Sequence, residues 1–223
     1  MQSSIVLLLL SCLVYSVVST AATVSSSSAA NPRVLILGDS LSAAHNISIE
    51  QSWPELFRHK LQTVAADAKL INASISGETS GGGLERLPAL LQRHQPSHLI
   101  LELGGNDGLR GYKFSQTQNN LGDIIQLALK RNIAVLLIGV RLPPNLGPLY
   151  NQRFQQVYEQ LAAQNPIAYL PRFLQGIAAD RAEYMQPDGI HPTALAQPLL
   201  ADKVFRAFQD HYFTGTASSK SSN

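Results

Sequence analysis

Short apolar runs alternate with longer stretches of helical periodicity along most of the chain, beginning at Arg33. Five of these runs are rich in Leu, Ile and Val, and we predict them to be β-strands. They are residues 33–37, 69–72, 98–103, 134–138 and 167–170. Their nearly continuous apolar character is typical of strands that are covered on both faces, as in a parallel sheet.

The segments between these runs carry apolar residues at every third or fourth position, which places their side chains on one face of a helix. The clearest sets are Leu84, Leu87 and Leu91; Leu121, Ile124, Ile125 and Ala128; and Phe154, Val157, Tyr158 and Leu161. A last helix is predicted from Pro192 to about Tyr212. The alternation of strand and helix predicts a single-domain α/β fold, a three-layer sandwich with helices on both faces of the sheet.

Composition and charge fit one ordinary globular domain. The chain has 223 residues, of which 45% are hydrophobic, enough for a sizeable core. Its formal net charge is +2 and its basic residues are scattered, so we expect no nucleic-acid partner. We expect the protein to be a monomer.

The first thirty residues are typical of an export segment. From Ile5 to Val18 the chain is mostly apolar, short for a membrane span but long enough for a signal peptide. We predict a signal peptide over residues 1–22, a Ser/Ala-rich linker over 23–32, a domain over 33–212 and a disordered tail over 213–223. Because Met1 to Ser4 contains no Lys or Arg, an uncleaved membrane anchor is the alternative.

Cys12 is the only cysteine, so a chain cleaved after it would contain no disulfide. Leu9-Leu10-Ser11-Cys12 also resembles a bacterial lipobox, in which the cysteine is acylated. We therefore expect a periplasmic or secreted protein that associates with a membrane only if Cys12 is lipidated.

Candidate chemistry begins directly after the first predicted strand. In open α/β sheets ligands bind beyond the carboxyl ends of the strands, and Ser40 lies there in the sequence Leu37-Gly38-Asp39-Ser40. A serine that opens a helix has backbone N–H groups beside it, which favours a nucleophile that generates negative charge. Asp39, Ser40 and Ser42 are equally good helix caps, so a purely structural role remains open here.

Two further segments follow the second and third predicted strands. Gly77 could bring a backbone N–H close to a ligand, or could simply form a turn. Asn106, in Gly104-Gly105-Asn106-Asp107-Gly108, could present its amide to an oxyanion, although Asn, Asp and Gly also dominate ordinary turns.

The fourth segment is Asp188-Gly189-Ile190-His191-Pro192. A catalytic triad needs a carboxylate that orients an imidazole, and an Asp and a His three residues apart in a turn can meet in this way. Pro192 suits a first helical position and favours an extended His191 just outside the helix. The alternative is a helix-capping segment with an exposed histidine.

These segments together resemble the four conserved blocks of the SGNH hydrolases, the GDSL-type lipases and esterases. The blocks correspond to Gly38-Asp39-Ser40-Leu41, Gly77, Gly104-Gly105-Asn106-Asp107 and Asp188-Gly189-Ile190-His191. Within that family the chain is most similar to the bacterial periplasmic enzymes that act as acyl-thioesterases and lysophospholipases. The resemblance extends from about Arg33 to Phe208.

The resemblance implies a flavodoxin-like parallel sheet of five strands in the order 2-1-3-4-5. It also implies that Ser40 is the nucleophile, that Asp188 and His191 complete the triad, and that no metal or cofactor is needed. The oxyanion hole would comprise the N–H groups of Ser40 and Gly77 and the side chain of Asn106. Substrates would be acyl esters and thioesters, lysophospholipids among them.

The loops after the third and fourth predicted strands are candidates for the walls of an acyl-chain groove, with Leu109, Tyr112, Leu142 and Pro143 as binding residues. His45 stands where relatives often carry tyrosine, and we expect it to be a surface side chain. Two other functions are compatible with the sequence: a carbohydrate acetylesterase, and a non-catalytic extracytoplasmic binding module. A conventional α/β-hydrolase is disfavoured, because Ser40 lacks the G-x-S-x-G setting.

Overall fold

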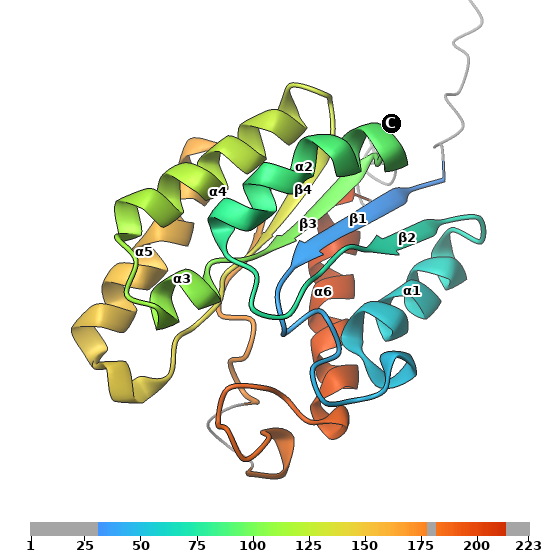
Figure 1. The fold of residues 1–223 in the computed structure, drawn as a ribbon. Helices are drawn as coiled ribbons and strands as arrows, with labels where there is room; N and C mark the ends of the chain where they lie inside the picture. The colour runs from blue at the N-terminus through green and yellow to red at the C-terminus, as the bar shows by residue number, and fades with distance from the viewer. Residues whose placement is uncertain (1–30, 178–181, 213–223) are drawn as a thin grey trace, which may run out of the picture. The chain divides into compact units, whose positions relative to one another are not determined.

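A parallel five-stranded sheet forms the centre of the molecule (Figure 1). The computed structural model describes residues 31–177 and 182–212. The strands are β1 (Arg33–Gly38), β2 (Lys69–Asn72), β3 (His98–Glu102), β4 (Ala134–Ile138) and β5 (Ala168–Leu170). Their order is β2-β1-β3-β4-β5, which confirms the predicted order 2-1-3-4-5.

Helices cover both faces of this sheet, as Figure 1 shows. On one face α1 (Trp53–Val64) packs against α6 (Gln197–Tyr212), and on the other α4 (Phe114–Leu129) lies between α2 (Ser80–His94) and α5 (Pro148–Gln164). The short helix α3 (Gly105–Leu109) follows β3 at the carboxyl edge. The three-layer sandwich is therefore the arrangement that the alternating pattern predicts.

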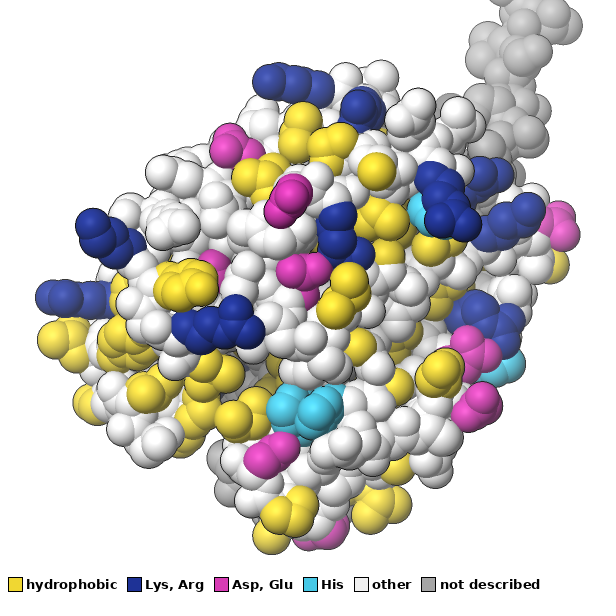
Figure 2. Space-filling model, in the orientation of Figure 1, with side chains coloured by type: hydrophobic (Ala, Val, Ile, Leu, Met, Phe, Trp, Pro, Cys, Tyr) yellow, Lys and Arg dark blue, Asp and Glu magenta, His cyan; other side chains and the backbone are white. Residues whose placement is uncertain are grey.

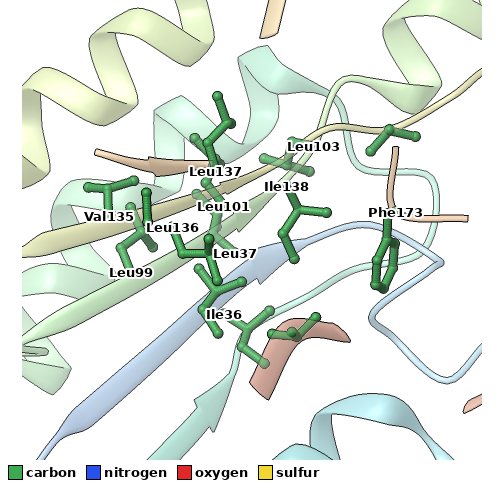
Figure 3. Close-up of a cluster of buried hydrophobic side chains, with 14 of the residues drawn as sticks. Ile36, Leu37, Leu99, Leu101, Leu103, Val135, Leu136, Leu137, Ile138 and Phe173 are labelled. Atoms are coloured by element: carbon green, nitrogen blue, oxygen red, sulfur yellow. The ribbon is translucent and has the colours of Figure 1, made fainter. Parts of the chain in front are cut away.

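The apolar strand residues form the core. Leu35, Leu99 and Leu136 are fully buried, and side chains from β1, β3 and β4 lie beside one another in Figure 3. Because both faces of each central strand are covered, no position on these strands has to be polar to meet water. One strand residue breaks this pattern: Glu102, at the end of β3, is an acid with no exposed surface.

The C-terminal helix begins later than predicted. The segment from Pro192 is not helical: Pro192 forms an isolated bridge with Met185, and the Thr193 N–H donates to the carbonyl oxygen of Tyr184 at 2.8 Å. A 3-10 turn, η4 (Ala194–Ala196), precedes α6, which begins at Gln197. Extended pairing with residues 184 and 185 therefore takes priority over the helix-starting tendency of proline.

The predicted signal peptide, most of the linker and the predicted tail lie outside the described residues. Within the part that is described, no helix combines the length and the apolar character that crossing a bilayer requires.

Candidate active site

Ser40 lies two residues beyond the end of β1, where the chain turns sharply. A Cβ atom on Gly38 would lie only 2.9 Å from Glu102 Oε2 and from the Ser42 side chain, so only glycine fits there. The turn is closed by the Ser42 and Ala43 N–H groups, which both donate to the carbonyl oxygen of Asp39. The glycine thus allows β1 to approach β3 while the next residues present Ser40 at the carboxyl edge of the sheet.

A chain of hydrogen bonds connects Ser40, His191 and Asp188. The Ser40 Oγ lies 2.8 Å from His191 Nε2, and His191 Nδ1 lies 2.7 Å from Asp188 Oδ2. The other oxygen of Asp188 accepts from the N–H groups of Ile190 and His191 at 2.9 and 3.0 Å. The turn from 188 to 191 therefore holds carboxylate and imidazole together locally, and the tertiary fold carries both to the end of β1.

The carboxylate of Asp188 is held in its charged form. Partial burial by itself would raise the pKa of Asp188, but hydrogen bonds from the His191 N–H, the His191 ring and the Ile190 N–H lower it to about 2. An ionised carboxylate beside Nδ1 keeps the proton on that nitrogen and leaves Nε2 free to accept one. The arrangement is suited to general base chemistry at neutral pH.

Donors for a developing oxyanion surround Ser40. Among the described residues, neither the Ser40 N–H nor the Gly77 N–H donates to another group, and both residues line the same cavity. The Asn106 amide also lines it, but Nδ2 already donates to Asp39 Oδ2 at 3.1 Å and to the Glu78 carbonyl at 3.0 Å. These two acceptors fix the orientation of Asn106, and an oxyanion would share one of its hydrogens.

Two buried acids lie behind the turn, and sequence reasoning missed both roles. Glu102 Oε2 accepts from the Ser42 hydroxyl at 2.7 Å and from the Asp39 N–H at 3.3 Å. Burial raises the pKa of Glu102 well above its usual range, and the charge of nearby Asp39 raises it further. Burial also raises the pKa of Asp39 to about 6, although the Leu41 N–H and the nearby His191 oppose the shift. These acids anchor the turn that carries Ser40.

A cavity of about 420 Å³ opens beside the Ser40 hydroxyl. Its walls are largely apolar, and include Leu41, Leu109, Val140, Leu142, Pro143, Pro144, Leu174, Met185 and Ile190. Three of the four predicted groove residues, Leu109, Leu142 and Pro143, thus line it. Tyr112 does not: Gly111, with φ of 72°, turns the chain, and Tyr112 lines a separate hollow next to α5.

His45 lies against the site rather than on the open surface, contrary to our expectation. Its ring centroid is 4.0 Å from that of His191, with 32° between the planes, and its side chain is half-buried. In Figure 2 the largest group of histidine atoms (cyan) lies next to hydrophobic side chains (yellow). The sequence signals were its position five residues after Ser40 and its replacement of the tyrosine that relatives often carry, and neither indicates a contact with His191.

Among the described residues, one group of three side chains could ligate a metal. It comprises His45, Asp188 and His191, whose potential ligand atoms lie within 4.8 Å of one another. Both ring nitrogens of His191 already have partners in the hydrogen-bonded chain. We therefore assign these residues to the hydrogen-bonded site rather than to a metal.

The fold and the site together define a serine hydrolase on a parallel α/β sheet. The chain belongs to the GDSL-like Lipase/Acylhydrolase family, which it matches over residues 36–197. It is 46% identical over 177 residues to Esterase TesA of Pseudomonas aeruginosa, covering 79% of this chain and 88% of that protein. It is 45% identical over 181 residues to Thioesterase 1/protease 1/lysophospholipase L1 of Escherichia coli, covering 81% and 85%. A solved structure of TesA superposes with a TM-score of 0.77 at 45% identity, covering 80% of this chain and 98% of that one.

Proposed function

We propose that this chain hydrolyses acyl esters and thioesters through an acyl-enzyme formed on Ser40. The observation that carries the proposal is the connected pair of short distances, 2.8 Å from Ser40 Oγ to His191 Nε2 and 2.7 Å from His191 Nδ1 to Asp188. A serine hydroxyl is a weak nucleophile until a base removes its proton, and this geometry supplies that base and its orienting carboxylate.

In the first half-reaction His191 Nε2 takes the proton of the Ser40 hydroxyl as Oγ bonds to the carbonyl carbon. The carbonyl electron pair moves onto the oxygen, where the Ser40 and Gly77 N–H groups and the Asn106 amide stabilise it. When the tetrahedral intermediate collapses, the bond to the leaving alcohol or thiol breaks, and His191 returns the proton to that group. Water activated by His191 then attacks the acyl-enzyme, releasing the acid and restoring Ser40.

The cavity supports an acyl substrate of appreciable length. Its apolar walls match a hydrocarbon chain, whereas a carbohydrate acetylesterase would need polar groups for the sugar and little room for the acid. Relatives named esterase, thioesterase and lysophospholipase point in the same direction. We expect Leu142→Phe to shift preference toward shorter acyl chains, with Val64→Phe on the far end of α1 as the control. Unchanged chain-length preference would contradict this assignment.

The proposed place of action is the periplasm or the external medium, since the apolar segment from Ile5 to Val18 has the length of a signal peptide. The mass of the mature N-terminus tests this. A free terminus near residue 22 supports a soluble exported form, an acylated Cys12 supports a lipid-anchored one, and an intact Met1 argues against cleavage.

Labelling with a fluorophosphonate tests the proposed chemistry. The reagent forms a covalent bond with a serine that is activated by a neighbouring base, so a single adduct on the peptide that contains Ser40 is expected. Ser40→Ala should abolish both labelling and p-nitrophenyl ester hydrolysis while leaving the melting temperature unchanged. Wild-type turnover in that variant, or the absence of labelling in the parent, would favour a non-catalytic binding module instead.

A further inference from the structure

Exposed apolar side chains extend from one side of the catalytic cavity. Leu109, the last residue of α3, and Tyr112, in the loop between α3 and α4, have 40% and 41% of their surface exposed. Leu146, at the end of the 3-10 turn η2 (Pro144–Leu146), and Leu149, in the first turn of α5, are 38% and 59% exposed. We call these four residues the apolar lobe. Figure 2 shows hydrophobic side chains gathered over this region, at the lower left, where Figure 1 places α3 and the start of α5.

The two segments of the apolar lobe form one continuous surface. Tyr112 and Leu149 line a common hollow of about 510 Å³. The Tyr150 hydroxyl donates to the carbonyl oxygen of Gly108 at 2.8 Å, which ties the start of α5 to the end of α3. Leu109 belongs both to this surface and to the wall of the catalytic cavity. The lobe therefore extends from the cavity mouth outward.

Positive charge surrounds the apolar lobe. Residues 108–122 and 139–158 contain four basic residues and no acidic residue. The four are Arg110, Lys113, Arg141 and Arg153, and all are exposed. None of them takes part in the ion pairs formed by the described residues. An apolar centre with a cationic rim matches the two layers of an anionic bilayer surface, its hydrocarbon and its headgroups.

We infer that the apolar lobe docks on the surface of an anionic phospholipid bilayer. Docked in this way, the cavity mouth faces the lipid, and the acyl chain of a lysophospholipid can pass from the bilayer to Ser40 along apolar walls. This inference rests on the proposed function, which supplies a lipid substrate. It also removes the need for a lipidated Cys12, because the folded domain carries its own membrane contact.

Vesicle flotation of the Ser40→Ala protein measures docking without hydrolysis. We expect it to float with vesicles of phosphatidylcholine mixed with phosphatidylglycerol at low salt, and far less with phosphatidylcholine alone or at high salt. Arg153→Gln should weaken binding about fivefold, the effect of about 1 kcal/mol per cation at an anionic surface. Leu149→Ser should weaken it by a similar factor, about fivefold, since half a leucine side chain would leave the apolar phase.

Matched controls lie at the opposite edge of the sheet. Arg131→Gln, in the turn before β4, and Val64→Ser, at the end of α1, remove a guanidinium and a branched apolar side chain from exposed positions and should leave flotation unchanged. Equal binding to both kinds of vesicle, or equal losses in the controls, would overturn the inference. So would a dimer in lipid-free size-exclusion chromatography that Leu149→Ser converts to a monomer, because a second copy would then cover the lobe.

Activity measurements separate this inference from the proposed function. With Ser40 intact, Leu149→Ser and Arg153→Gln should hydrolyse water-soluble p-nitrophenyl butyrate at the parent rate, but should hydrolyse lysophospholipid embedded in anionic vesicles severalfold more slowly. If the parent does not hydrolyse butyrate, the proposed function is wrong, and docking is then judged from the flotation result alone. Equal rates on embedded lysophospholipid would defeat docking alone.

Discussion

The ring of His45 stacks on the ring of His191, with 4.0 Å between their centroids and 32° between their planes. Ala44, directly before it, has φ of 58°, a left-handed conformation that is uncommon for a residue with a Cβ atom. The contact covers one face of the imidazole that bonds to Ser40. A side chain in this place can hold the imidazole in its working orientation, and it also lines the cavity beside Ser40.

Removing the His45 ring should allow the His191 imidazole to leave its working orientation more often. We expect His45→Ala to lower kcat about 2- to 10-fold with little change in KM, since an aromatic contact is worth about 0.5–1.5 kcal/mol. His45→Phe keeps a flat ring and should restore most of the loss. Steady-state kinetics with p-nitrophenyl esters decides the matter: equal impairment in both variants would mean that the imidazole chemistry of His45, rather than its shape, is required.

Asn106→Ala should lower kcat about 10²–10³-fold, the usual effect of removing one oxyanion donor. KM should change little, because the interaction strengthens only as negative charge develops on the carbonyl oxygen. Asn119→Ala, an exposed position on α4, is a suitable control. A loss that appears mainly in KM would assign Asn106 to substrate binding instead.

Asp188→Asn should lower kcat about 10³–10⁴-fold, because an amide can stabilise the wrong tautomer of His191. The pKa of Asp188 is lowered to about 2, so this group contributes stability that is present above its unfolded pKa near 4 and is lost as pH falls toward 2. In thermal melts, the wild type should therefore lose its advantage over Asp188→Asn between about pH 4 and pH 2. A constant difference through that window would contradict the pKa assignment.

The positions of the strands, of Ser40 and of the pair Asp188–His191 could be predicted, because each depends on local patterns. Leu, Ile and Val cluster in the buried strands, and the turn from 188 to 191 brings its own two side chains together. The parallel sheet then places the residues that follow β1 and β3 at one edge.

Features that depend on distant parts of the chain could not be predicted. Glu102 lies in an apolar strand. Its burial is explained by the sheet register, which pairs it with Gly38, and by the hydrogen bond that it accepts from Ser42. The place of Tyr112 depends on the backbone turn at Gly111, and that of His45 on where His191 arrives from the other end of the chain. Residue type alone carries none of this information.

Asp39 offers the sharpest test of the buried charges behind the turn. Burial raises its pKa to about 6, against 3.8 for the free group. Between these values the folded protein binds a proton that the unfolded chain releases, so folding stability should fall as pH rises from about 4 to 6. A shift of about two units corresponds to about 3 kcal/mol at neutral pH. The neutral side chain of Asp39→Asn removes this dependence.

The informative quantity is the difference in unfolding free energy between Asp39→Asn and wild type. Losing the acceptor for Asn106 lowers stability by a similar amount at every pH, whereas the relief of the buried charge grows with pH. The difference should therefore move in favour of the variant by about 3 kcal/mol between pH 4 and pH 7. Asp123→Asn, at an exposed position on α4, should show no such trend. The activity of Asp39→Asn should be lower than that of the wild type, because the Asn106 amide would then face another amide instead of a carboxylate. If urea titrations give the same difference at every pH in this range, Asp39 ionises in the folded protein as it does in the unfolded chain. That result would contradict the raised pKa that we attribute to its burial.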